Sequence, residues 1–240
     1  MFPRLFRQRR CDMSPYARKY QLFDSLTYHI YNRSNSKKVI FYDEQDYEHF
    51  CIILKKYIAM FSLRIYHWVI MPTHYHLLLE LVDPEKLSRA IAGISLAYTK
   101  YFHKRYKGCG YLWQGRFQSK PVQKENYMLS CGRYIDYNPV KDKIVTVASD
   151  YTYGSARFYC LGIDDGITTT DPMYEDLGTE KAQRQEAYTH FLQKYNDVDN
   201  TRWEDMKTPQ GDEMFIQRLI KGNGRIISLR RGRPKTKQKN

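Results

Sequence analysis

The stretch of sequence that decides the fold is LRIYHWVIMPTHYHLLLEL, residues 63–81. It contains two runs of β-forming residues, Leu63–Met71 and His74–Leu81, which are separated only by Pro72 and Thr73. So short a break between two such runs predicts a tight turn, and therefore an antiparallel hairpin.

Further strands and helices are expected on both sides of this hairpin. Some segments alternate with period two, as strands do, and others repeat apolar residues at helical spacing. The predicted elements are strands at 25–32, 63–71, 74–81 and 111–122, and helices at 43–60, 83–106 and 125–138, the last bounded by Pro139. The order β-α-β-β-α-β-α favours an α+β fold, in which one antiparallel sheet carries helices on one face.

The charge divides the chain into four parts. Residues 1–20 hold six Lys and Arg against one acid, a net charge of +5, and residues 221–240 hold eight and none, a net charge of +8. Residues 21–160 hold 19 basic and 12 acidic residues (+7), whereas 161–220 hold 6 and 13 (−7). We therefore expect a basic N-terminal arm, a basic body, an acidic helical appendage and a basic tail with these boundaries.

The acidic appendage differs from the body in composition. Its first part, Asp164–Pro172, is rich in Asp, Thr and Gly and is typical of a linker. Helices are expected after it, at 180–195 and 213–220.

The composition also narrows the class of protein. Basic terminal arms favour a nucleic-acid partner over a merely solubilising role, because each phosphate contact releases counterions. Five cysteines without a CxxC pair indicate neither a disulfide framework nor a zinc knuckle. No apolar run is long enough for a membrane span, and no hydrophobic stretch follows the N-terminal arginines as in a signal peptide. We expect a cytoplasmic, nucleoid-associated protein without a membrane partner.

His74-Tyr75-His76 is the first candidate site. Residues two apart on a strand project from the same face, so the two imidazoles can converge on one divalent ion while Tyr75 packs on the other face. A histidine pair by itself is equally compatible with two ordinary surface or core histidines.

Tyr134 and Asn138 form the second candidate site. They are four residues apart and share one face of a predicted helix, near its end at Pro139. A tyrosine beside a metal ion can attack phosphorus, and an asparagine carbonyl beside imidazole suits Mg²⁺ or Mn²⁺. The alternative is that Tyr134 packs in the core and Asn138 caps the helix.

Several motifs occur in an order that resembles a known family. They include YHIYNR (28–33), WVIMPTHYH (68–76), LWQGRF (112–117) and RYIDYNPV (133–140). Together, over about residues 21–160, they resemble the single-tyrosine HUH transposases, and most of all the REP-associated tyrosine transposases. Ser34 and Thr73 depart from this pattern, because relatives commonly have glycine and asparagine there.

The resemblance implies an HUH endonuclease fold with a ferredoxin-like, RRM-like sheet. It implies that His74, His76 and Asn138 bind one Mg²⁺ or Mn²⁺ ion and that Tyr134 is the nucleophile. In that family the tyrosine attacks single-stranded DNA at palindromes or hairpins and forms a 5′-phosphotyrosine link. A homodimer with the tyrosine donated in trans is possible in relatives, and this sequence does not decide it.

Other residues are weaker candidates for DNA contact. Arg33, Arg116 and Arg133 are candidate phosphate ligands, although each is as readily a solvated side chain. Trp113 is a candidate for stacking on an unpaired base, with a place in the core as the alternative. Tyr137 is the rival nucleophile, and His67 is expected to be a satisfied core histidine or one that supports the metal ligands from behind.

The tail contains RRGRPK, residues 230–235. This motif resembles an AT-hook, in which Arg231 and Arg233 would enter the minor groove of duplex DNA. A disordered solubilising tail is the alternative.

The sequence thus favours a single-strand DNA endonuclease and strand transferase, a transposase acting on repetitive palindromic elements. Two alternatives remain. One is a catalytically silent, sequence-specific DNA-binding protein that keeps the fold. The other is a replication-initiator-type nickase, which usually brings a helicase domain that is not found here.

Overall fold

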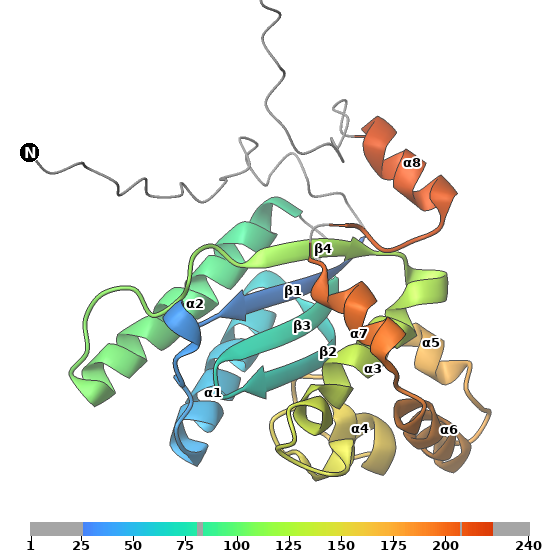
Figure 1. Cartoon of the computed structure of the whole chain (residues 1–240), viewed down its shortest axis with the longest axis horizontal. Helices are drawn as coiled ribbons and strands as arrows, with labels where there is room; N and C mark the ends of the chain where they lie inside the picture. The colour runs from blue at the N-terminus through green and yellow to red at the C-terminus, as the bar shows by residue number, and fades with distance from the viewer. Residues whose placement is uncertain (1–25, 81–83, 207, 223–240) are drawn as a thin grey trace, which may run out of the picture.

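The predicted hairpin forms the centre of the structure. The computed structural model describes residues 26–80, 84–206 and 208–222. In it β2 (Arg64–Met71) and β3 (His74–Glu80) pair antiparallel, with Met71 opposite His74. β1 (Thr27–Arg33) pairs with the free side of β3, and β4 (Gln118–Val122) pairs with β1. The sheet order β2-β3-β1-β4 is that of a ferredoxin-like fold, as expected (Figure 1).

Only the second half of the last predicted strand, 111–122, is a strand. β4 begins at Gln118, opposite Tyr31, and the residues before it form a loop. The loop crosses the end of β1, where the backbone N–H of Gln114 donates to the Arg33 carbonyl oxygen at 2.9 Å. The β-forming composition of this loop reflects the buried side chains of Trp113 and Phe117 and not a continuous strand.

One face of the sheet is covered by two helices, α1 (Glu44–Phe61) and α2 (Pro84–Tyr106). Asp43 caps α1, because its side chain accepts a hydrogen bond from the Asp46 amide. The sheet contributes alternate side chains such as Ile30 and Leu77 to this core, and both are fully buried. Full burial of one such side chain stabilises the folded state by about 1.5–3 kcal/mol, so this face supplies much of the driving force for folding.

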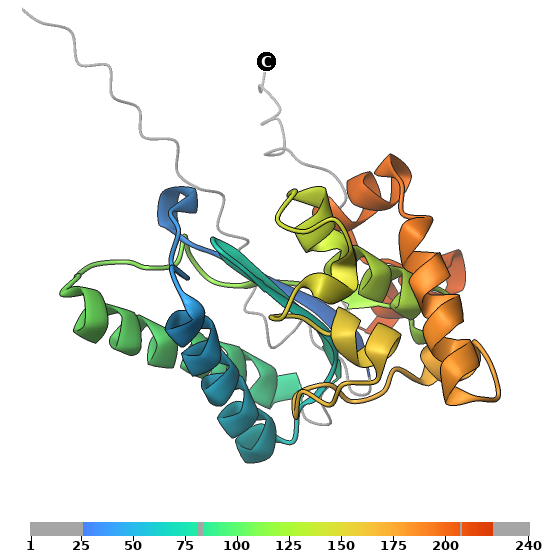
Figure 2. The ribbon, with the colours of Figure 1, turned by 90° about the horizontal axis from the view of Figure 1, so that it is seen from below.

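The expectation of helices on one face only is wrong. α3 (Lys124–Lys141) packs on the opposite face of the sheet, against Leu78 and Val122 (Figure 2). The reason lies in β3, where six of seven residues are buried, including the continuous run Leu77–Leu79. Such a run indicates a strand that is buried on both faces.

α3 also continues past Pro139, which was expected to end it, and finishes at Lys141. A proline in a helix lacks the N–H that would bond to the carbonyl four residues earlier, here that of Ile135. The Asn138 side chain compensates, since its Nδ2 donates to the carbonyl oxygens of Tyr134 at 2.7 Å and Ile135 at 3.4 Å. One further turn of helix therefore remains after Asn138.

The appendage is helical, as expected, and it packs against α3 and the edge of the sheet. Its helices at 180–195 and 213–220 are confirmed, and further short helices were not predicted. The helices of this region are α5 (Pro172–Glu175), α6 (Lys181–Gln193), α7 (Asp197–Glu204) and α8 (Glu213–Gly222), and α4 (Ala156–Leu161) directly precedes it. Within the described residues the 3₁₀ turns are η2 (Asn35–Lys37) and η3 (Ala148–Asp150).

The segment Asp164–Pro172 is not the free linker that its composition indicated. Thr168 bridges to Ile65 at the edge of β2, and the Thr169 amide donates to the Ile65 carbonyl oxygen at 2.7 Å. Asp165 accepts a hydrogen bond from the Trp68 indole at 3.1 Å. The polar residues of this segment therefore satisfy an otherwise open sheet edge.

None of the helices in the part of the chain that the structure describes has the length and apolar character needed to cross a bilayer.

A buried ionic cluster joins β2, α3 and the appendage. His67 is fully buried between two carboxylates, with Nδ1 at 3.0 Å from Asp136 and Nε2 at 3.2 Å from Asp171. Tyr188 of α6 donates to the same Asp136 at 2.7 Å. Burial lowers the pKa of His67, but the two carboxylates outweigh burial and raise it to about 9. The prediction that His67 is a satisfied core histidine is confirmed.

This cluster predicts a pH-dependent free energy of unfolding. A histidine whose pKa rises from 6.5 to about 9 on folding stabilises the folded state below pH 6.5, and this contribution is lost as the pH approaches 9. We expect a loss on the order of 1–3 kcal/mol over this range, measured by urea unfolding at a series of pH values. Glutamine cannot carry the charge, so the free energy of unfolding of His67→Gln should not show this loss between pH 6.5 and 9. Parallel curves for the two proteins would contradict the assignment.

Candidate active site

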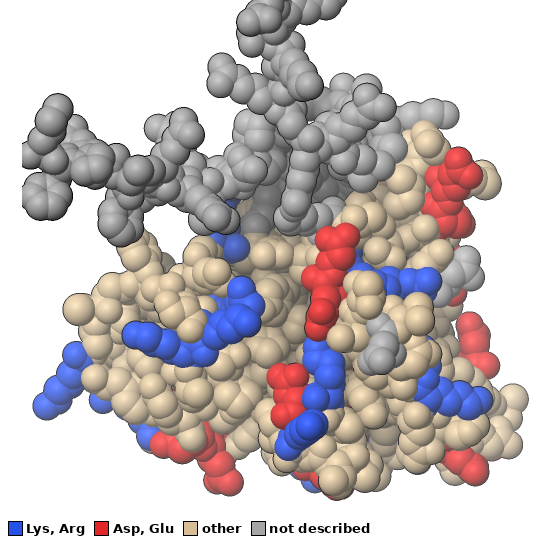
Figure 3. All heavy atoms as spheres, viewed as in Figure 1, with Lys and Arg blue, Asp and Glu red and all other residues tan. Residues whose placement is uncertain are grey.

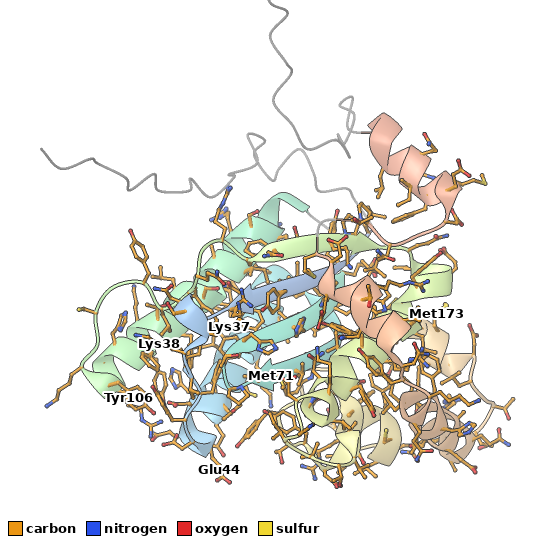
Figure 4. The ribbon with its side chains drawn as sticks, viewed as in Figure 1. Lys37, Lys38, Glu44, Met71, Tyr106 and Met173 are labelled. Atoms are coloured by element: carbon orange, nitrogen blue, oxygen red, sulfur yellow. The ribbon has the colours of Figure 1, made fainter. Side chains whose placement is uncertain are left out.

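A pocket of about 540 Å³ opens where β1 and β3 face α3. Lys37, labelled in Figure 4, lines it from η2, directly after β1. The full lining comprises Tyr31, Arg33, Lys37, Thr73, His74, His76, Gln118, Tyr134, Asn138, Lys141, Asp142, Trp203, Glu204 and Met206. The structure therefore brings both predicted pairs, the histidines and Tyr134 with Asn138, to one pocket.

The two histidines lie side by side at the start of β3, with ring centroids 5.2 Å apart. Nδ1 of His74 is 2.9 Å from the Thr73 hydroxyl, and Nδ1 of His76 is 2.8 Å from Nε2 of His29 on β1. Both Nδ1 atoms are thus engaged, which leaves Nε2 of each ring as the candidate metal ligand. Thr73, which departs from the family pattern, still supplies a partner for His74.

Both imidazoles are held in the neutral form. Burial lowers the pKa of His74 to about 4, with the charges of Lys141 and Arg33 as further causes. Burial also holds the pKa of His76 well below its usual range, and the neighbouring His29 and His74 add to the effect. Neutral imidazole is the form that coordinates a metal ion, so the pair is ready to bind one without releasing protons.

Tyr134 and Asn138 lie one turn apart on α3. The Tyr134 ring meets the His76 ring edge to face, with centroids 5.5 Å apart, and is only 3% exposed. Asn138 is buried, and its Nδ2 is engaged by the backbone of α3, so Oδ1 is the acceptor that the amide can offer a metal ion. Burial raises the pKa of the Tyr134 phenol, which therefore stays protonated in the free protein.

The donors available here suit a hard divalent ion. No three His, Cys, Asp or Glu side chains form a metal-binding group within the described residues. The set in the pocket combines two neutral imidazoles, His74 and His76, with the amide oxygen of Asn138. This mixture of nitrogen and oxygen donors is compatible with Mg²⁺ or Mn²⁺.

Tyr137, the rival nucleophile, does not line the pocket. Its ring stacks on that of Tyr195, with centroids 4.4 Å apart. A tyrosine that the sequence did not single out lies closer, since Tyr31 stacks on His76 at 4.7 Å and meets His74 edge-on at 5.6 Å. Tyr31 is therefore the rival that the geometry identifies.

The predicted arginines are placed differently from one another. Arg33 lines the pocket and donates to Gln114 Oε1 from Nε at 3.0 Å and from Nη2 at 2.8 Å. Arg133 points towards α6, where its guanidinium lies 4.1 Å from the Phe191 ring centroid, so a role as phosphate clamp at the pocket is not supported. Arg116 is exposed and lies outside the pocket lining.

Trp113 occupies the core and not an open DNA surface. It is 9% exposed, lies edge-on to Tyr75, and donates its indole N–H to the Ser95 carbonyl oxygen at 3.0 Å. Stacking on a base would require the ring to leave this position. Arg231 and Arg233 of the AT-hook-like motif lie outside the described residues.

Besides Tyr31, two further residues at the pocket were not predicted from the sequence, and each left a signal there. His29 is two residues before Tyr31 on the same strand, so period-two alternation places it on the pocket face, where it bonds to His76. Lys141 is seven residues after Tyr134, on the same helix face. It was missed because the helix was expected to end at Pro139.

The remaining wall of the pocket comes from α7 and the residues directly after it. Lys120 of β4 is buried, and its Nζ donates to the carbonyl oxygens of Arg202 at 3.0 Å and Asp205 at 2.6 Å. These bonds position the fully buried Trp203 and the exposed Glu204 at the pocket. No local sequence pattern connects residue 120 to residue 202.

Comparisons with known proteins identify similar transposases. Residues 22–138 match the family model described as "Transposase IS200 like". A solved structure of a REP-associated tyrosine transposase bound to a REP hairpin is 21% identical, with a TM-score of 0.50, over 66% of this chain and 93% of that one. A putative transposase from Deinococcus radiodurans R1 is 18% identical, with a TM-score of 0.36, over 48% and 92%. No curated protein matched the chain. Over residues 22–138 the chain is therefore similar to the IS200-like transposases.

Proposed function

We propose that the protein is a metal-dependent single-strand DNA endonuclease and strand transferase, of the REP-associated tyrosine transposase kind. The observation that carries the proposal is the meeting of His74, His76, Tyr134 and Asn138 in one pocket. The structural neighbour that is bound to a REP hairpin supports palindromic or hairpin DNA as the substrate.

In this proposal Nε2 of His74, Nε2 of His76 and Oδ1 of Asn138 hold one Mg²⁺ or Mn²⁺ ion. When bound, the ion acts as a Lewis acid that withdraws charge from the scissile phosphate. His29 keeps His76 in orientation through their shared hydrogen bond. The Asn138 amide is oriented by its bonds to the helix backbone.

Tyr134 supplies the nucleophile. Its phenolic oxygen attacks the scissile phosphorus and forms a bond to it. The phosphate stays attached to the 5′ oxygen of one strand, and the bond from phosphorus to the 3′ oxygen of the other strand breaks. The proton lost by the phenol is balanced by the proton that the leaving 3′ oxygen gains. One phosphodiester is exchanged for another, so the reverse step can join a new strand without an energy source.

The basic tail, which includes Arg231 and Arg233, would hold neighbouring duplex DNA.

The nucleophile can be tested by its covalent adduct. With Mn²⁺ or Mg²⁺, the wild-type protein should nick a single-stranded DNA hairpin and remain attached, which is seen as a shifted band on a denaturing gel. Tyr134→Phe removes only the attacking oxygen and should abolish the adduct. Tyr137→Phe preserves the stacking on Tyr195 and should retain it.

The same gel separates the alternatives. An adduct that survives in Tyr134→Phe but disappears in Tyr31→Phe or Tyr137→Phe would show that the nucleophile is assigned wrongly. If the wild-type protein forms no adduct with any hairpin, yet binds it, the catalytically silent DNA-binding alternative is favoured.

The metal site can be tested through His29. His29→Phe keeps the ring but removes the hydrogen bond that orients His76, so we expect the affinity for Mn²⁺ to fall by about 10–100-fold. The affinity is measured by calorimetric titration of the free protein. His49→Phe, on α1 and stacked on Tyr101, is the matched control and should bind like the wild type. Equal affinities for all three proteins would refute the proposed role of His29.

A further inference from the structure

We propose that Lys141 is a further catalytic residue, whose ammonium group binds the scissile phosphate beside Tyr134 in exchange for the carboxylate of Glu204. The inference rests on the proposed function, because it assumes that Tyr134 attacks a phosphodiester in this pocket. It concerns a residue that neither the histidine pair nor the Tyr134/Asn138 pair involves.

The position of Lys141 on α3 is the first argument. Tyr134, Asn138 and Lys141 follow one another at four and three residues, which places all three on one helix face. Lys141 lines the pocket, and its Nζ lies 5.4 Å from the centroid of the Tyr134 ring. A phosphate within bonding distance of the Tyr134 hydroxyl would therefore lie close to this cation.

Lys37 also lines the pocket but is exposed, and three other cations near the pocket are engaged elsewhere. Lys120 is buried and donates to two backbone carbonyl oxygens of the α7 region. Arg133 is turned towards Phe191. Arg33 is held by Gln114 through two nitrogens, although it remains at the rim. Lys141 is the half-buried cation that lies directly over the proposed nucleophile.

The partners of Lys141 are ones that a phosphate can replace. Its Nζ is 3.1 Å from Glu204 Oε1 and 3.2 Å from Asn200 Oδ1. The Glu204 side chain is 55% exposed, and an exposed ion pair contributes little to stability. A phosphodiester carries one negative charge, as the carboxylate does, so the exchange leaves the charge around Lys141 unchanged. In the view of Figure 3, basic and acidic side chains lie next to one another near the middle of the molecule, so cations there are generally accompanied by carboxylates.

The chemistry of the step needs such a cation. Negative charge develops on the phosphate oxygens as the phenol attacks, and an ammonium group held beside them stabilises that charge. Because Lys141 is on the same helix as Tyr134, no domain movement is needed to bring the two together.

The test uses the full-length protein and a single-stranded DNA hairpin. At saturating DNA with Mn²⁺, Lys141→Met should lower the rate constant of adduct formation by about 10²-fold or more, and Lys141→Arg should restore part of it. Lys143→Met is the matched control, because it removes the same charge two residues away, on an exposed residue outside the pocket lining. Its rate should stay within about twofold of the wild type. The melting temperature of each variant is to be compared with that of the wild type, so that misfolding is excluded as the cause of a lower rate.

A binding measurement separates this inference from the proposed function. In the Tyr134→Phe background no adduct can form, and the loss of one phosphate contact in Lys141→Met should reduce the salt slope of DNA affinity by about 0.7. Glu204→Gln removes the competing carboxylate and should tighten binding. An absence of adduct in the wild type would refute the proposed function alone. A rate and a salt slope in Lys141→Met equal to those of Lys143→Met would refute the role of Lys141.

Discussion

The antiparallel pairing of β1 with β3 is the constraint on which the site depends. Its register places Arg33 opposite His74 and Tyr31 opposite His76, and it brings His29 within hydrogen-bonding distance of His76. Side chains alternate between faces, so a slip of one residue would turn both histidines into the opposite core. The register is held because the other face, which carries Ile30 and Leu77, is fully buried under α1 and α2.

The second face of the sheet carries the candidate site, and α3 is the element that completes the pocket. The sheet contributes the imidazoles, whereas the helix contributes the phenol and the amide. Asn138 has two functions in this arrangement. Its nitrogen compensates for the hydrogen bond that Pro139 cannot make, and its oxygen remains for a ligand. The same hydrogen bonds allow the helix to continue to Lys141. The residue that compensates for Pro139 therefore also brings a lysine to the pocket.

The appendage is part of the site and not only an addition to it. α7 lies against the pocket because Lys120, in the middle of β4, donates to carbonyl oxygens at the end of that helix. The cluster of His67, Asp136 and Asp171 attaches the appendage to α3 from the other side. Both attachments use buried charge, which is costly to leave unpaired, so they favour one arrangement of the appendage over others.

The sequence by itself determined the hairpin, the element order and the α+β class, and it singled out His74, His76, Tyr134 and Asn138, which the fold brings to one pocket. These follow from local periodicity and from motifs in a fixed order. Both can be read from the sequence without any tertiary contact being known. Tertiary structure alone decided that α3 covers the second face, that Trp113 and Arg133 turn away from the pocket, and that α7 forms its wall. Those outcomes depend on contacts between residues far apart in the chain, such as Lys120 with Arg202, which no local pattern encodes.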